Sequence, residues 1–249
     1  MKNLKSNEQR SKNVIILIWI VLAIEIASLI SMYFQYEILL TTANGGYISF
    51  ETAALTSIMQ ILIEIIYLIV YIISGIAFIK WLRRAYYNLH TKINNLSHSD
   101  GWAAGCWFVP IVCLYMPFQI LKELYQKTHA LLAARIENYD GKISSSLVVW
   151  WWVLWILNSI IGQFTSPNVM KAGTIDQLTN MTIVSIISSL VAIPLALVTI
   201  KMIKDYSSVE PLLYNLQDDY LPETITTTTN NNRWLSPLGF MEIKVPGNM

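Results

Sequence analysis

Four long runs of apolar residues, separated by polar segments, dominate the hydrophobic pattern of this chain. They cover Val14–Phe34, Ala53–Ile79, Leu147–Phe164 and Thr182–Ile203. Each has about 18 residues or more, so a helix rising about 1.5 Å per residue would cross the roughly 30 Å hydrocarbon core of a bilayer. The pattern predicts an all-α integral membrane protein with four transmembrane helices.

A fifth apolar segment, Trp102–Leu121, has a similar length but contains Pro110 and Pro117. Each proline removes a backbone donor and clashes with the preceding helical turn. We therefore expect a proline-broken segment that is re-entrant or interfacial. The other helices should cover it, because irregular backbone does not face lipid. A true fifth span, with the C-terminus outside, is the competing interpretation.

Lysine and arginine are distributed unevenly around these runs. Of the 17 such residues, none lies in residues 35–52 and one, Lys171, lies in residues 165–181. Cytoplasmic loops carry an excess of these residues. The N-terminus (1–13), the central region and the C-terminal part are therefore expected in the cytoplasm. The same rule argues against a fifth span, which would move a basic flank outside.

The first apolar run follows a basic N-terminal segment, as the core of a signal peptide would. It continues to about Phe34, whereas a signal-peptide core has about 7–15 residues. An uncleaved first transmembrane helix is therefore the preferred interpretation.

The segments outside the spans predict one helix and one tail. Phe118–Ile136 has apolar side chains at helical spacing and basic ones elsewhere, so it predicts an amphipathic helix that could lie on the inner membrane face. The membrane domain would cover residues 14–205. Residues 206–249 would form a cytoplasmic, mostly disordered tail, because Thr226–Thr229 and Asn230–Asn232 are of low complexity.

Composition supports the membrane assignment. The chain is 54% hydrophobic and 13% charged, against about 25% charged residues in soluble domains. Its net charge of +1 gives no reason to expect nucleic acid as a partner. Cys106 and Cys113 share one apolar segment, at a spacing that suggests neither a disulfide nor a zinc site. The expected partner is the lipid bilayer, with a homo-oligomer or a membrane or cytoplasmic protein as a further one.

Two acidic residues, Glu25 and Glu64, lie near the middle of the first and second runs. Charged side chains at this depth are costly and usually mark ion or proton paths. The two helices are expected to be antiparallel neighbours, so the carboxylates could approach each other as an ion or proton site. The alternative is that each glutamate is protonated and hydrogen-bonded within the bundle.

Polar and aromatic residues near the span ends give two further candidate sites. Arg84 and Asn88 share a helix face. They would either anchor the helix at lipid phosphates or, with Gln119, hold the broken segment through its free carbonyls. Tryptophans gather at the start of the third span. They suit a membrane interface, or alternatively a stacked site for a lipid or quinone-like molecule. These are Trp150, Trp151, Trp152 and Trp155.

The same region carries a specific pattern of residues. It runs from Arg84-Ala85 and Asn88 through Gly101-Trp102 to Trp107-Phe108-Val109-Pro110, Leu114, Pro117 and Gln119, and the tryptophan-rich span follows. In this pattern the chain resembles the bacterial membrane proteins grouped as domain of unknown function family 4328, over roughly residues 50–205. The resemblance implies a multi-span membrane protein of a bacterial inner membrane and transfers no activity.

Sequence motifs for enzymes are missing. The chain has no HExxH, GxSxG, P-loop or GxGxxG pattern, and its three histidines lie outside the spans at no ligand-like spacing. We expect no catalytic residue, metal or cofactor. The preferred function is a non-enzymatic scaffold, sensor or regulatory subunit. The alternative is a small channel or a proton- or cation-coupled transporter that uses Glu25 and Glu64.

Overall fold

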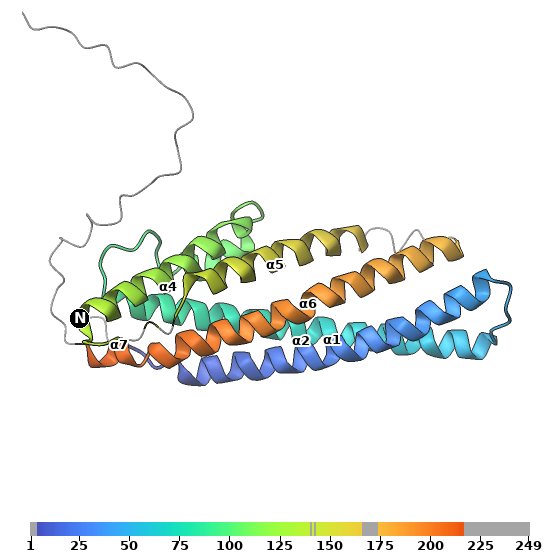
Figure 1. Ribbon diagram of the computed structural model, residues 1–249, viewed down its shortest axis with the longest axis horizontal. Coiled ribbons are helices and arrows are strands. Elements are labelled where there is room, and N and C mark those ends of the chain that lie inside the picture. The colour runs from blue at the N-terminus through green and yellow to red at the C-terminus, as the bar shows by residue number, and fades with distance from the viewer. Residues whose placement is uncertain (1–3, 140, 142, 166–173, 217–249) are drawn as a thin grey trace, which may run out of the picture. The chain divides into compact units, whose positions relative to one another are not determined.

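The computed structural model describes residues 4–139, 141, 143–165 and 174–216, and these residues form an all-α structure (Figure 1). The long helices are α1 (Glu8–Ala43), α2 (Phe50–His90), α5 (Ser145–Thr165) and α6 (Ile175–Val209). Between α2 and α5 lie α3 (Trp102–Gly105), η1 (Cys106–Phe108), η2 (Val112–Leu114) and α4 (Met116–Arg135), and α7 (Leu212–Asn215) follows α6.

Among the described residues, four helices are long and apolar enough to cross a membrane, namely α1, α2, α5 and α6. Their outward side chains are largely apolar. On α2, for example, Ile61, Ile65 and Leu68 are each more than 50% exposed. Soluble domains rarely expose apolar surface on this scale. The predicted all-α fold with four membrane-spanning candidates is confirmed.

The helices pack side by side. α1 contacts α2 and α6, α6 also contacts α5, and α4 contacts α5 and α2. In Figure 1 the α1–α2 loop and the start of α6 lie toward one end of the bundle, and α4 and α7 lie toward the other. Large side chains are fully buried where α2, α4 and α6 meet. They include Trp81, Leu82, Tyr86, Leu121, Leu124, Met202 and Ile203. The bundle therefore has a protein core where these three helices meet.

Local signals in the sequence set where the helices begin and end. The Ser49 side chain accepts a hydrogen bond from the Thr52 amide at 3.1 Å at the start of α2, and Thr174 accepts one from Gln177 at 3.3 Å at the start of α6. After α1 the chain turns at Gly45, whose φ of 77° favours glycine. The short turn makes α1 and α2 antiparallel neighbours.

The segment 102–121 is broken, as its prolines predict. Pro110 lies between the short turns η1 and η2, and Pro117 lies in the first turn of α4, where a missing amide donor costs nothing. The described residues do not form the continuous fifth span of the competing interpretation. The side chains of Phe108 and Ile111 are each 77% exposed. The break therefore presents an apolar tip to the surroundings.

The predicted amphipathic helix is α4, and its apolar face is covered by protein. Leu121, Leu124 and Leu132 are fully buried, and the Tyr125 hydroxyl donates to the Met202 carbonyl of α6 at 2.5 Å. The bundle covers this face, whereas the sequence left open that the helix lies on the inner membrane face. The sequence pattern predicted which face of α4 is buried, but it did not indicate that the helical bundle buries this face.

The packed region continues beyond the expected start of the tail at residue 206. α6 ends at Val209, α7 follows, and the side chains of Glu210 and Leu213 are 4% and 0% exposed. The boundary between the packed helices and the expected tail therefore lies closer to residue 216 than to residue 206. Residues 217–249, the rest of the expected tail, lie outside the described residues.

Candidate functional site

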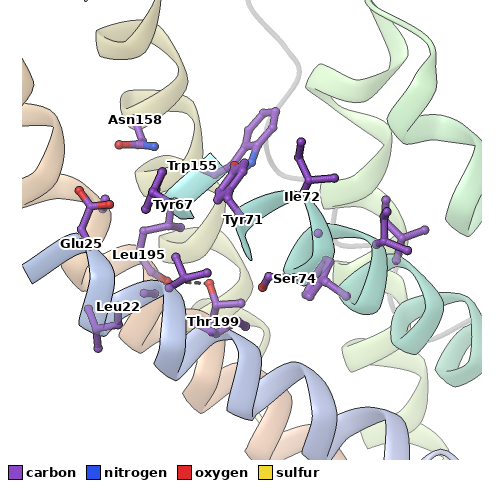
Figure 2. A pocket seen from close by; sticks show the side chains of 18 of the residues that line it. Leu22, Glu25, Tyr67, Tyr71, Ile72, Ser74, Trp155, Asn158, Leu195 and Thr199 are labelled. Atoms are coloured by element: carbon purple, nitrogen blue, oxygen red, sulfur yellow. Dashed lines mark hydrogen bonds between the residues drawn. The ribbon is translucent and has the colours of Figure 1, made fainter. Parts of the chain in front are cut away.

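A cavity of about 360 Å³ lies between α1, α2, α5, α6 and η1 (Figure 2). Its walls are mostly aliphatic and aromatic. Polar groups come from a few residues, among them Glu25, Tyr67, Tyr71 and Asn158. Figure 2 shows Glu25, Tyr67 and Asn158 on the same side of the cavity. An apolar cavity with a few convergent polar groups is the usual form of a small-molecule site.

Glu25 is the acidic group of this cavity. Its side chain is 8% exposed, and Tyr67 of α2 and Ser189 of α6 lie close enough to interact with its carboxylate. A buried carboxylate is costly unless such partners compensate for lost water. Among the described side chains that line the cavity, Glu25 is the single carboxylate, and none is lysine, arginine or histidine. The cavity therefore has an acidic end without a basic partner.

Glu64 lies on the neighbouring helix in different surroundings. It is exposed and does not line the cavity, and its carboxylate accepts hydrogen bonds from Ser28 and Gln60, both at 2.8 Å. It is close enough to Glu25 for the two charges to interact. The structure thus brings the two glutamates near each other, one inside the cavity and one on the outer surface of α2.

The aromatic wall of the cavity joins three elements. Trp107 of η1 packs against Phe78 of α2, with ring centroids 5.8 Å apart, and against Trp151 and Trp155 of α5, at 6.5 and 6.3 Å. Phe78 and Trp151 also stack at 5.9 Å. The Trp-Phe-Val-Pro segment is therefore fixed to the bundle through its tryptophan.

Three of the four tryptophans at the start of α5 are joined by ring contacts, in the order Trp151, Trp152, Trp155. Trp151 and Trp155 line the cavity. Trp152 stacks on Phe118 of α4 at 5.7 Å and on Trp155 at 5.0 Å. Trp150 is 64% exposed and points away from this group. Helical geometry explains the division, because adjacent residues on a helix face different directions.

The other motif residues of the broken segment have varied positions. Trp102 is 44% exposed on α3, and Pro117 is buried at the start of α4. The Pro110 carbonyl accepts from the Cys113 thiol at 2.9 Å, and the Gln119 side chain is exposed. Phe108 lines the cavity although it is largely exposed, so it lies at the cavity's edge.

Asn88 lies in a buried polar network at the other end of the bundle's core. Its side chain accepts from the Lys5 amide at 3.1 Å and donates to the Lys5 carbonyl at 2.9 Å and to Glu210 at 2.8 Å. Asn7 donates to both oxygens of Glu210, at 3.2 and 3.1 Å, and Arg84 is close enough to interact with that carboxylate. Arg84 and Asn88 thus converge on Glu210 and the N-terminal segment, whereas the sequence left open an anchor at lipid phosphates or a contact with the broken segment.

A second network, around Glu123 of α4, was not identified from the sequence. Its carboxylate accepts from the Tyr86 hydroxyl at 2.5 Å and from the backbone and hydroxyl of Ser97 at 2.9 and 2.8 Å. Burial acts to raise the pKa of Glu123. The hydrogen bonds from Tyr86 and Ser97 and the nearby His98 ring outweigh burial and hold that pKa below its usual range. The network fixes the loop after α2 to α4.

Among the described residues, no group of three or more histidine, cysteine or acidic side chains could hold a metal ion. The family model described as "Domain of unknown function (DUF4328)" matches residues 44–208, which extend from the α1–α2 loop almost to the end of α6. No curated protein and no solved structure matches the chain. The matched residues include the aromatic wall and Glu64, whereas Glu25 precedes them.

Proposed function

Because this chain belongs to the DUF4328 family, whose description states no activity, we propose a function from its own residues. We propose a multi-pass membrane protein that binds a small lipophilic molecule in the cavity beside Glu25 and works as a non-enzymatic sensor, scaffold or regulatory subunit. The observation that carries this proposal is that Trp107 and Phe108 of the broken segment line the same cavity as Glu25.

The connections of the broken segment support a sensing role. Trp107 packs on α2 and α5, and the same segment runs through Pro117 directly into α4. A ligand can shift an equilibrium only by contacting its two states differently. A molecule in this cavity would contact α1, α2, α5 and the broken segment together. Its presence would therefore bias how α4 packs at the protein core.

We further propose that the N-terminus, α4 and the C-terminal part lie in the cytoplasm of a bacterial cell, with the α1–α2 loop outside. The uneven distribution of lysine and arginine supports this orientation. The exposed apolar tip at Phe108 and Ile111 supports contact of the broken segment with the inner side of the bilayer.

Single-cysteine labelling tests this orientation. With Cys106 and Cys113 replaced by serine, a membrane-impermeant maleimide applied to intact cells is expected to label Asn44→Cys but not Asn95→Cys or Gln126→Cys, which are all at exposed positions. Permeabilised cells should label all three, which controls for accessibility. External labelling of Gln126→Cys would rule out the proposed sidedness of α4.

Filling the cavity tests the binding proposal. Gly75 lines the cavity, and a side chain added there meets no atom within 4 Å at its first carbon. Gly75→Phe is therefore expected to fold and to occupy ligand space. In detergent micelles, energy transfer from tryptophan to the neutral probe N-phenyl-1-naphthylamine should saturate in the wild type and lose its saturable part in Gly75→Phe.

Gly162→Phe is the matched control for this experiment. Gly162 lies on α5, also has open space at its added first carbon, and does not line the cavity. The Gly162→Phe variant should keep the saturable energy transfer from tryptophan to the probe that the wild type shows. Equal transfer in all three proteins would mean that the probe only partitions into micelles, and the binding proposal would fail.

The proximity of Glu25 to Glu64 favours a second candidate function, which is proton- or cation-coupled transport. The hydroxyls of Tyr67 and Ser189 lie close to Glu25, and the Ser28 hydroxyl donates to Glu64, which supports a polar path between the helices. Proton or cation flux into proteoliposomes that disappears in the Glu25→Gln, Glu64→Gln double variant would favour transport over sensing.

A further inference from the structure

The proposed function leaves the chemical class of the ligand open, and the charge of the cavity restricts it. Resting on that proposal, we infer that the cavity selects a lipophilic monocation: a protonated or quaternary amine, or a similar onium ion, carrying apolar substituents. The inference depends on the charge balance of the cavity, on its aromatic walls and on its size.

The charge balance favours a cation. Glu25 is the single carboxylate among the described lining residues, it is 8% exposed, and the side chains of Tyr67 and Ser189 beside it are neutral. No lysine, arginine or histidine lines the cavity to neutralise it. Glu64, the neighbouring acidic residue, lies outside the lining. A lipophilic anion would meet repulsion here, whereas a cation would supply the missing counter-charge.

The walls favour a cation with bulky apolar substituents. Tyr67 and Tyr71 of α2 and Trp107, Trp151 and Trp155 line the cavity along with aliphatic side chains. Aromatic rings attract cations through their electron-rich faces, and the attraction is strongest where water is excluded. The remaining apolar surface suits aryl or alkyl groups, which gain by leaving water. A small hydrated ion would gain little from such walls.

The cavity volume fits a compact organic ion. About 360 Å³ lies at the lower end of the roughly 300–1,000 Å³ range of small-molecule sites. A long-chain lipid would fill it only in part, with its chain extending beyond the cavity. Tetraphenylphosphonium is therefore a suitable probe, and tetraphenylborate has nearly the same shape with the opposite charge.

The experiment compares these two ions by equilibrium dialysis against the protein in dodecyl maltoside micelles, with empty micelles subtracted. Saturable binding of tetraphenylphosphonium is expected, with tetraphenylborate at least about tenfold weaker. Glu25→Gln should weaken tetraphenylphosphonium binding by about tenfold or more. Glu37→Gln is the matched control, since it removes a carboxylate of the same helix that does not line the cavity, and it should bind as the wild type does.

The neutral probe N-phenyl-1-naphthylamine separates this inference from the proposed function and reports whether Glu25→Gln has folded. If that probe binds Glu25→Gln normally while tetraphenylphosphonium binding falls, the inference is supported. Equal affinity for the two ions, or undiminished tetraphenylphosphonium binding by Glu25→Gln, overturns the cation preference and leaves the proposed function intact. Absence of saturable binding of either probe to the wild type overturns both.

Discussion

Asn88→Leu is expected to lower the free energy of unfolding by about 3 kcal/mol, because it leaves buried polar groups without partners. Leucine has a similar size but cannot bond with the Lys5 backbone or with Glu210. Glu210 is 4% exposed, so water cannot readily replace the lost donor. The measurement is denaturant-induced unfolding of the purified protein in detergent micelles, followed by circular dichroism.

Two further variants test whether Asn88 acts through this network. Asn95→Leu makes the same change at an exposed loop position and should alter stability by less than about 0.5 kcal/mol. In the double variant Asn88→Leu, Glu210→Leu the stranded carboxylate is removed, so the cost should be well below the sum of the two single costs. Simple additivity would show that the two side chains contribute independently.

The second large loss in the free energy of unfolding is expected from a substitution in the aromatic wall of the cavity. Trp151 is 3% exposed and contacts Phe78, Trp107 and Trp152, with ring centroids 5.9–6.5 Å away. Trp151→Ala removes these contacts and leaves a void, at a cost of about 3–5 kcal/mol. The same unfolding measurement in micelles gives this value.

Trp150→Ala is the control, because Trp150 precedes Trp151 in the chain and is 64% exposed. It should change stability by less than about 1 kcal/mol. A similar loss for both variants would mean that the whole tryptophan-rich turn stabilises the helix. A small loss for Trp151→Ala would mean that the broken segment does not depend on the wall for its position.

The fold could be read from the sequence because its strongest signals are local. Four uninterrupted apolar runs predict four long helices, and Pro110 and Pro117 predict a break between them. Both follow from backbone chemistry within a few residues. The end of α6 was less predictable. The last turns of α6 are buried against the N-terminal segment. The residue types around Glu210 do not indicate that contact.

The candidate site was only partly predictable, since its residues come from separate helices. The depth of Glu25 and Glu64 in their spans singled them out, and the structure does bring them near each other. Tyr67 and Ser189, which lie close to Glu25, carry no such signal, because a hydroxyl within a span is ordinary. Which face of each helix meets the others depends on packing across the whole bundle. The sequence pattern does not encode it at a fixed spacing.

The length of α2 gives the molecule a mechanical property. Its 41 residues contain no proline and extend about 60 Å, roughly twice the thickness of a hydrocarbon core. Its first turn follows the loop from α1, and its last turns are buried with Asn88 and Trp81. If the helix stays straight, a rotation of about 5° at its first residue moves its last residue by about 5 Å. A small change in tilt, such as one caused by bilayer thickness, would thus produce its largest displacement at the buried end that holds Asn88.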